Sequence, residues 1–213
     1  GKKVLITAGP TYEAIDPVCF IGNHSSGLMG FELAKAAANL GADVYLVTGP
    51  THLSIAHDTI HVVKVVSAED MYHSAQMYYD NSDIVICAAA VADYRPKSVA
   101  EQKIKKSDEN FTIELVKNKD ILKTFGEHKK NQYLVGFALE TENEVANALG
   151  KLKRKNLDAI VLNSMRDKGA GFGGTTNKIS FIDTNSTITT FELKTKADVA
   201  VDIFNEIIKR RYA

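Results

Sequence analysis

Glycine and small polar residues follow the first apolar run of the chain at a spacing suited to binding a phosphate group. The β-branched run Val4–Thr7 stops at Gly9 and Pro10, and a long polar connection then leads to Asn23–Gly27, where a helical pattern begins. Connections between a strand and a helix are usually about 2–6 residues long, and a much longer one is usually functional. Free N–H groups and the helix dipole at a helix N-terminus favour an anion. We therefore interpret this connection as a phosphate-binding loop that also carries polar side chains to a reaction centre.

A second group of candidate functional residues follows the apolar run Ile84–Ala90. Small residues at a strand end would let a flat ring approach the backbone, whose N–H and C=O groups can read a base; here they are Cys87, Ala88 and Ala89. Asp93 could accept a hydrogen bond from a ribose hydroxyl or help to hold a metal. Three lysines on the following loop could reach phosphates or could form a solvated charge run; they are Lys103, Lys105 and Lys106.

Composition indicates a globular protein without general affinity for nucleic acid. The 213 residues are enough for one substantial core, and 45% hydrophobic and 24% charged residues are ordinary values. The 26 basic residues balance 26 acidic ones, whereas nucleic-acid binders gain affinity by neutralising phosphates. No apolar run approaches the roughly 18 residues of a membrane span, so we expect no membrane partner. Cys19 and Cys87 form neither a disulfide framework nor a metal-ligand pattern, which predicts a reducing, cytoplasmic location.

Alternating strand and helix patterns must position these residues. The predicted strands are Val4–Thr7, Val44–Thr48, Ile60–Val66, Ile84–Ala90, Phe111–Val116, Tyr133–Leu139 and Ala159–Leu162. The predicted helices are Ser26–Leu40, Ala68–Tyr79, Asp120–His128, Glu142–Lys155 and Ala197–Arg210. A glycine-rich loop is expected at Gly169–Gly174, and a hairpin at Lys178–Asp183 and Thr187–Leu193.

These patterns predict a single α/β domain over residues 1–213. Its sheet is doubly wound, mostly parallel and Rossmann-like, flanked by helices, with an antiparallel hairpin near the C-terminus. Ligands bind outside the carboxyl ends of such strands. One site could therefore draw on the segments that follow Thr7, Ala90 and Leu139.

The motifs of better-known nucleotide-binding proteins do not fit. Gly22, Gly27 and Gly30 are not spaced as G-x-G-x-x-G, and the second strand ends in Thr48–Pro50 rather than in an acidic residue. The sequence contains no G-x-x-x-x-G-K-[ST] loop, which excludes a P-loop NTPase. An isolated histidine such as His24 is more often structural than catalytic. A nicotinamide-dependent oxidoreductase on the same fold, and a nucleotide-sensing module without turnover, remain alternatives.

Four motifs in order resemble the phosphopantothenoylcysteine synthetase family. They are G-P-T at 9–11, N-H-S-S-G-x-M-G at 23–30, A-A-V-A-D-Y at 89–94 and K-I-K-K at 103–106. The resemblance covers essentially the whole chain and extends to Val116–Ile121, Val135–Thr141 and the segment from Lys151 to Asp158. It implies a ligase that joins 4′-phosphopantothenate to L-cysteine in coenzyme A biosynthesis.

The resemblance also implies the reaction and the partners. CTP, accompanied by Mg²⁺, would activate the carboxylate as an acyl-cytidylate with release of pyrophosphate, and the amine of cysteine would then displace CMP. ATP is the alternative co-substrate, because eukaryotic relatives favour it. Family members are homodimers, and we expect the hairpin at 178–193 to contribute a dimer contact. Many relatives are fused to a phosphopantothenoylcysteine decarboxylase, so a stand-alone ligase and an excised domain are both compatible with this chain.

Residue roles follow from the same resemblance. Asn23 would hold the acyl-cytidylate for amine attack, and Lys103 would neutralise the α-phosphate during activation. The other nucleotide-binding residues that it implies are Ser25, Ser26, Gly27, Cys87, Ala88, Ala89, Asp93, Lys119, Asp120, Ile121, Leu122, Phe137, Lys151 and Lys155. No Mg²⁺ ligand can be named. Cys19 replaces an arginine of many relatives, so anchoring of the substrate's phosphate is expected to differ, and Lys119 replaces a proline.

Overall fold

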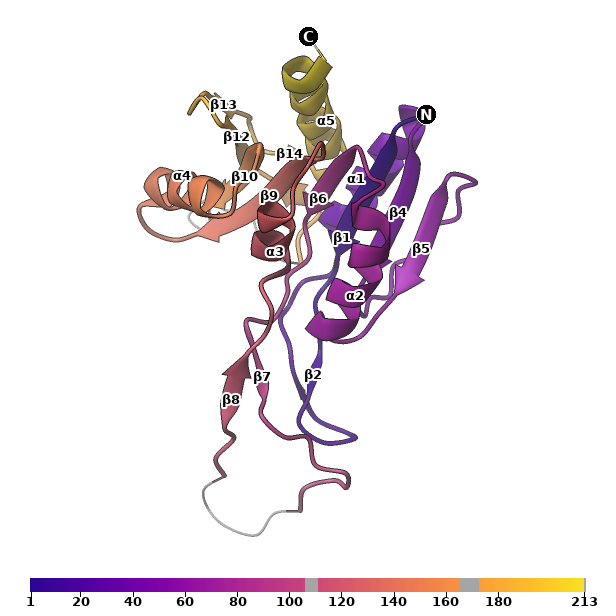
Figure 1. Ribbon diagram of the computed structural model, residues 1–213, viewed down its shortest axis with the longest axis vertical. Helices are drawn as coiled ribbons and strands as arrows, with labels where there is room; N and C mark the ends of the chain where they lie inside the picture. The colour runs from indigo at the N-terminus through magenta and orange to yellow at the C-terminus, as the bar shows by residue number, and fades with distance from the viewer. Residues whose placement is uncertain (106–110, 165–172, 213) are drawn as a thin grey trace.

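A mostly parallel eight-stranded sheet forms the centre of the computed structural model, which describes residues 1–105, 111–164 and 173–212 (Figure 1). The strand order is β13-β12-β10-β9-β6-β1-β4-β5. These strands are β1 (Lys3–Ala8), β4 (Asp43–Thr48), β5 (Ile60–Lys64), β6 (Ile84–Cys87), β9 (Tyr133–Glu140), β10 (Ala159–Ser164), β12 (Ile179–Asp183) and β13 (Ile188–Thr190). All neighbours from β10 to β5 are parallel, whereas β12 and β13 are antiparallel. The predicted fold class is confirmed, and the predicted hairpin extends one edge of the sheet.

Helices cover both faces of the sheet. The helices α1 (Leu28–Asn39) and α5 (Lys196–Tyr212) pack on the face that carries Val4 and Ile6 of β1. On the other face, which carries Leu5, lie α2 (Ala68–Tyr79), α3 (Ile121–Glu127) and α4 (Glu144–Arg154). Successive side chains of a strand point to opposite faces, so a strand that is buried on both sides must be apolar throughout. This requirement explains why the continuous apolar runs predicted the central strands correctly.

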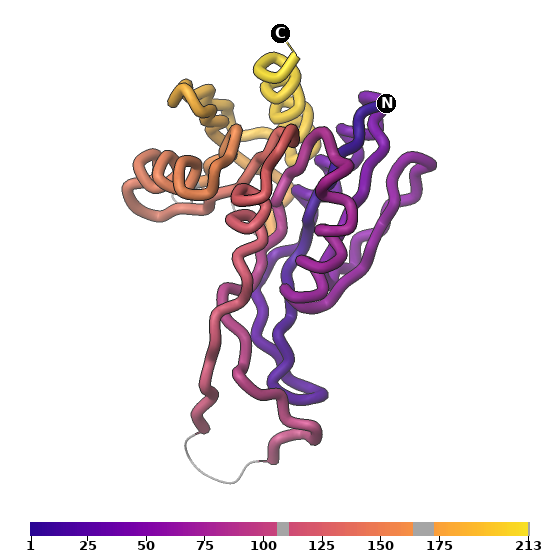
Figure 2. Tube along the Cα trace, in the orientation of Figure 1, coloured from indigo at the N-terminus to yellow at the C-terminus, as the bar shows by residue number. Residues whose placement is uncertain are grey.

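An arm projects from the carboxyl edge of the sheet, away from both chain termini (Figures 1 and 2). It contains the hairpin β2 (Glu13–Ala14) and β3 (Phe20–Ile21) and the ribbon β7 (Tyr94–Pro96) and β8 (Leu115–Lys117). The two parts are joined where the Asp16 carboxylate accepts a hydrogen bond from the Ile104 N–H at 3.0 Å. Hydrogen bonds from the N–H groups of Ile104, Cys19 and Val18 hold the pKa of Asp16 below its ordinary value.

Several sequence-based boundaries were wrong at the edges of correctly identified features, as the helix expected at Glu142–Lys155 and observed as α4 shows. The strand expected at Phe111–Val116 is reduced to β8, and the strand expected at Ile84–Ala90 ends at Cys87. The helix expected from Ser26 begins at Leu28, because Gly27 has φ +81° and caps it. Lys106 and most of the loop expected at Gly169–Gly174 lie outside the described residues. A short ladder of β11 (Thr176–Asn177) with β14 (Lys194–Thr195) was not predicted. None of the helices in the described ranges has the length and apolar character of a membrane span.

Candidate functional site

Two adjoining cavities open at the carboxyl edge of the sheet. The first, here called the α1 cavity, encloses about 230 Å³ beside the N-terminus of α1. The second, the α3 cavity, encloses about 160 Å³ beside the N-terminus of α3. Ala89, Val91, Phe137 and Lys151 line both cavities, so one elongated ligand could occupy them together. The segments after β1, β6 and β9 therefore meet at one site, as expected for a parallel sheet.

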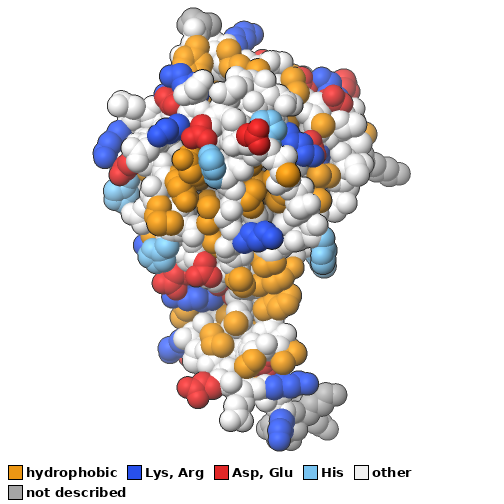
Figure 3. All heavy atoms as spheres, turned by 90° about the vertical axis from the view of Figure 1, so that its right-hand side faces the viewer, with side chains coloured by type: hydrophobic (Ala, Val, Ile, Leu, Met, Phe, Trp, Pro, Cys, Tyr) orange, Lys and Arg blue, Asp and Glu red, His pale blue; other side chains and the backbone are white. Residues whose placement is uncertain are grey.

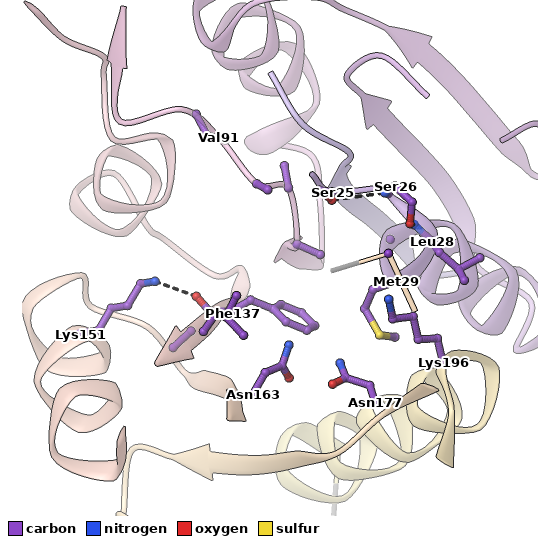
Figure 4. A pocket seen from close by; sticks show the side chains of 18 residues that line it. Ser25, Ser26, Leu28, Met29, Val91, Phe137, Lys151, Asn163, Asn177 and Lys196 are labelled. Atoms are coloured by element: carbon purple, nitrogen blue, oxygen red, sulfur yellow. Dashed lines mark hydrogen bonds between the residues drawn. The ribbon is translucent and has the colours of Figure 1, made fainter. Parts of the chain in front are cut away.

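The α1 cavity is built on a close approach between the start of α1 and the end of β1. Ser25, Ser26 and Gly27 line it, together with Ala88 from the segment after β6 (Figure 4). A Cβ on Gly27 would lie 3.1 Å from the Gly9 Cα, and its positive φ is one that side chains rarely adopt. The first turn of α1 carries no acidic residue. The N-terminus of this helix consequently favours an anion.

Asn23 joins two segments of the site that are far apart in the sequence. Its Nδ2 donates to the Ala90 carbonyl at 2.6 Å, and its Oδ1 accepts from the Ser25 N–H at 3.0 Å. The amide thus ties the loop before α1 to the segment after β6. Asn23 itself is not among the residues that line either cavity.

The α3 cavity is lined by the neutral Cys87 and by both acidic and basic side chains. Burial raises the pKa of the Cys87 thiol to about 12, so the side chain stays uncharged at neutral pH. Asp93 lines the same cavity, as do the consecutive residues Lys119–Leu122. The Lys119 ammonium lies 3.9 Å from the centre of the Tyr72 ring, a cation–π contact at the base of the arm.

Lys151 brings positive charge to the junction of the cavities, and Lys155 brings it to the wall of the α3 cavity. The Lys151 Nζ donates to the Phe137 carbonyl at 2.7 Å, and the Lys155 Nζ lies 2.7 Å from the Asp120 carboxylate (Figure 4 shows the first contact). Burial and the neighbouring Lys155 lower the pKa of Lys151. Burial opposes ionisation of Asp120, but hydrogen bonds from Lys155 and from the Lys123 N–H outweigh it and lower its pKa. Both lysines could turn to a phosphate from these positions.

Lys103 stands apart from the other predicted residues. It is exposed on the arm, near Asp16, and lines neither cavity of its own chain. The remaining predicted nucleotide-binding residues line one cavity or both. Among the described residues, no group of three or more His, Cys, Asp or Glu side chains is placed to hold a metal ion.

Sequence reasoning missed three polar residues that line the α1 cavity. Asn163 lies near the carboxyl end of β10, Asn177 belongs to β11, and Lys196 begins α5. A usable signal existed only for Asn163, which follows a buried parallel strand as the other site residues do. The other two come from segments that only the folded topology brings to the cavity.

Comparison with known proteins relates the chain to one family. A family model described as "DNA/pantothenate metabolism flavoprotein C-terminal domain" matches residues 1–211. A protein from an unknown prokaryotic organism, named cysteine/cysteine sulfinic acid decarboxylase, is 52% identical over 209 residues, which are 98% of this chain and 58% of that protein. The coenzyme A biosynthesis bifunctional protein CoaBC of Bacillus subtilis (strain 168) is 48% identical over 207 residues, 97% of this chain and 51% of that protein.

A solved structure supports the same family relationship. The crystal structure of the C-terminal domain of the coenzyme A biosynthesis bifunctional protein CoaBC matches with a TM-score of 0.83 at 43% sequence identity, covering 97% of this chain and 94% of that chain. The chain spans a little over half the length of the two curated relatives described above.

Proposed function

The chain belongs to the DNA/pantothenate metabolism flavoprotein C-terminal domain family, and from this premise we propose that it is a ligase joining 4′-phosphopantothenate to L-cysteine in coenzyme A biosynthesis. The resemblance to phosphopantothenoylcysteine synthetase noted in the sequence is thereby confirmed at the level of the family. The observation that carries the proposal is the adjoining pair of cavities, with a helix N-terminus in one, Lys151 at their junction and Lys155 in the α3 cavity. Such an arrangement suits a nucleoside triphosphate.

CTP is the proposed co-substrate, with its base and ribose in the α3 cavity and its phosphates directed towards α1. The small residues after β6 leave the backbone accessible to a base, and the neutral Cys87 thiol adds no charge there. Asp93 is suited to accept hydrogen bonds from the ribose. Lys151 and Lys155 would then meet the phosphates that bridge the two cavities.

The chemistry runs in two steps. A carboxylate oxygen of 4′-phosphopantothenate attacks the α-phosphorus, the bond from this phosphorus to the pyrophosphate oxygen breaks, and pyrophosphate leaves with the electron pair. The amine of cysteine then attacks the acyl carbon, loses its proton, and displaces CMP. Positioning and charge neutralisation supply most of the catalysis in reactions of this type. Mg²⁺, when bound to the phosphates, would add further neutralisation.

Asn23 is proposed to keep the acyl-cytidylate in position for amine attack. Its hydrogen bond to the Ala90 carbonyl fixes the amide beside the segment that follows β6. Aspartate at this position cannot donate to the Ala90 carbonyl, and it places a negative charge beside the intermediate. The Asn23→Asp variant should therefore accumulate acyl-nucleotide, which quenched-flow chromatography would detect. An unchanged rate of ligation would refute the role.

A homodimer would reconcile Lys103 with its proposed role. The arm exposes large apolar side chains, among them Val18, Phe20, Tyr94, Val99 and Leu115. Figure 3 shows hydrophobic side chains on the surface of the arm. A second copy that covers this surface could receive Lys103 from its neighbour. The hairpin of β12 and β13 remains the other candidate contact. Analytical ultracentrifugation at working concentration tests the dimer, and a monomer would contradict it.

Product analysis separates the proposed ligase from its alternatives. We expect pyrophosphate release from CTP that depends on 4′-phosphopantothenate, and 4′-phosphopantothenoylcysteine only when cysteine is added. Equal or better turnover with ATP would assign the ATP-using version. Tight CTP binding without pyrophosphate release would indicate a sensing module, and binding of NAD(P)H an oxidoreductase. Release of CO₂ from cysteine would support the activity named for the decarboxylase relative instead.

A phosphopantothenoylcysteine decarboxylase is the proposed functional partner.

A further inference from the structure

Two segments that line the α3 cavity are tied together by a single residue. Residues 91–93 follow β6, and residues 118–122 lead into α3. Asn118 links them twice: its Nδ2 donates to the Ala92 carbonyl at 2.8 Å, and its backbone N–H donates to the Asp93 carbonyl at 2.9 Å. The spacing between these two parts of the cavity wall therefore depends on Asn118.

Arg95 of β7 determines which way the Asn118 amide faces. Its Nη1 donates to the Asn118 Oδ1 at 3.0 Å and to the Lys117 carbonyl at 3.1 Å. A guanidinium can only donate, so the amide must turn its oxygen to Arg95 and its nitrogen to the Ala92 carbonyl. A charged donor also makes the stronger hydrogen bond, and it polarises the amide whose nitrogen donates in turn. The two side chains thus form a continuous chain of hydrogen bonds from the arm to the cavity wall.

Arg95 reaches this chain from outside the α3 cavity. The ribbon of β7 and β8 lies below α3 in the view of Figure 1, where the arm begins. Asn118 lines both the α3 cavity and a neighbouring groove, whereas Arg95 lines the groove alone. Arg95 can consequently act on a ligand in the α3 cavity only through Asn118.

We propose that Asn118 is a positioning residue for the nucleoside part of the nucleotide, and that Arg95 supports it from the arm. This rests on the proposed function, in which the base and the ribose occupy the α3 cavity. Asn118 holds Asp93 and the segment after β6 at a fixed distance from the start of α3 before the ligand arrives. A wall that is ordered in advance lowers the entropy lost on binding, so the affinity for the base and the ribose rises.

The test compares Asn118→Ala with Gln132→Ala, which removes a buried amide outside both cavities. The Gln132 Nε2 donates to the Tyr79 carbonyl at 3.3 Å, and its Oε1 accepts from the Lys130 N–H at 2.8 Å, next to the amino end of β9. Calorimetric titrations would measure the affinities for CMP and CTP. Asn118→Ala loses two side-chain hydrogen bonds and should weaken both affinities by the same factor, about 10-fold. Gln132→Ala should lower the thermal midpoint and leave both affinities unchanged.

Arg95→Met provides a second variant, which keeps the Asn118 side chain but frees its amide to turn. It should weaken CMP and CTP binding about 3-fold, whether or not Asn118→Ala folds. In steady-state kinetics both variants should raise the KM for CTP and leave kcat unchanged, because the lost contacts are the same in the ground state and the transition state. A lower kcat at an unchanged KM for CTP would contradict the positioning role.

The outcomes separate this proposal from the proposed function. The proposal is overturned if CMP affinity is unchanged in Asn118→Ala and Arg95→Met, or if Gln132→Ala weakens it as much as they do. Product formation by the wild type together with such a result would leave the ligase function standing. CMP binding that depends on Asn118 in a protein that forms no product would refute the ligase function and support the positioning role.

Discussion

Replacing Gly30 by alanine should push α1 away from β1 and weaken nucleotide binding. A Cβ on Gly30 would lie 2.4 Å from the Ala8 Cβ and 3.1 Å from the Ala8 Cα. Carbon atoms in contact are about 3.5–4.0 Å apart, so the helix must retreat by roughly 1 Å. Overpacking of this kind costs about 1–3 kcal/mol, whereas alanine gains about 0.5–1 kcal/mol over glycine in a helix. We expect the variant to be destabilised by about 0–2.5 kcal/mol after this gain is subtracted.

Gly150→Ala is the matched control for this prediction. Gly150 lies within α4, and its Cβ would meet only the far end of the Arg154 side chain, which can move aside. This control should therefore gain about 0.5–1 kcal/mol of stability. Urea unfolding followed by circular dichroism measures both changes, and titration with CTP measures the displacement of the cavity wall. If Gly30→Ala is as stable as Gly150→Ala and binds CTP normally, the close contact between α1 and β1 is wrong.

Three further perturbations test the remaining contacts. Asp183→Asn should lower stability by about 1–3 kcal/mol at pH 7, because the carboxylate accepts from the Arg210 Nε at 2.9 Å. Burial opposes ionisation of Asp183, but hydrogen bonds from Arg210 and from the Thr187 and Asn185 N–H groups outweigh it and lower its pKa below 3.8. The contribution of the carboxylate is therefore complete above that pH and is lost as the pH falls through the lowered pKa. Denaturation curves at several pH values should converge in acid for wild type and variant; a constant difference would contradict this reasoning. Tyr79→Phe should cost about 1–2 kcal/mol, since the Phe125 carbonyl loses a buried donor, and an unchanged urea midpoint would speak against the bond. Lys155→Met should weaken CTP binding about ten-fold in equilibrium dialysis, and unchanged affinity would remove this lysine from the site.

The central sheet and its helices were predictable because local patterns determine them. The run Ile84–Cys87 is apolar throughout and occupies a strand that is buried on both faces. The helix α2 has the predicted bounds, because Ser67 and Asp70 form a capping box at its start. The start of α1 was less predictable. Ser25 and Ser26 are residue types that often cap a helix, yet the N-cap is Gly27. Its positive φ and its close packing against Gly9 favour glycine at this position.

The arm and the far end of the α1 cavity depend on contacts between distant segments. Tyr94 pairs with Lys117 and the Ala100 N–H donates to the Ile15 carbonyl, so no local window contains the complete structure. The segments that contribute Asn163 and Lys196 likewise meet only through the fold. The sequence predicted which strand ends would form the site. The polar residues that the C-terminal segments contribute to it could be identified only from the folded structure.

A crystal structure of the protein with CTP and Mg²⁺ tests the central claim most directly. We predict that the base occupies the α3 cavity beside Cys87 and that the phosphates extend past Lys151 to the N-terminus of α1. A nucleotide bound outside both cavities, on the arm or against the outer surface of α3, would contradict the claim that these two cavities form one nucleotide site.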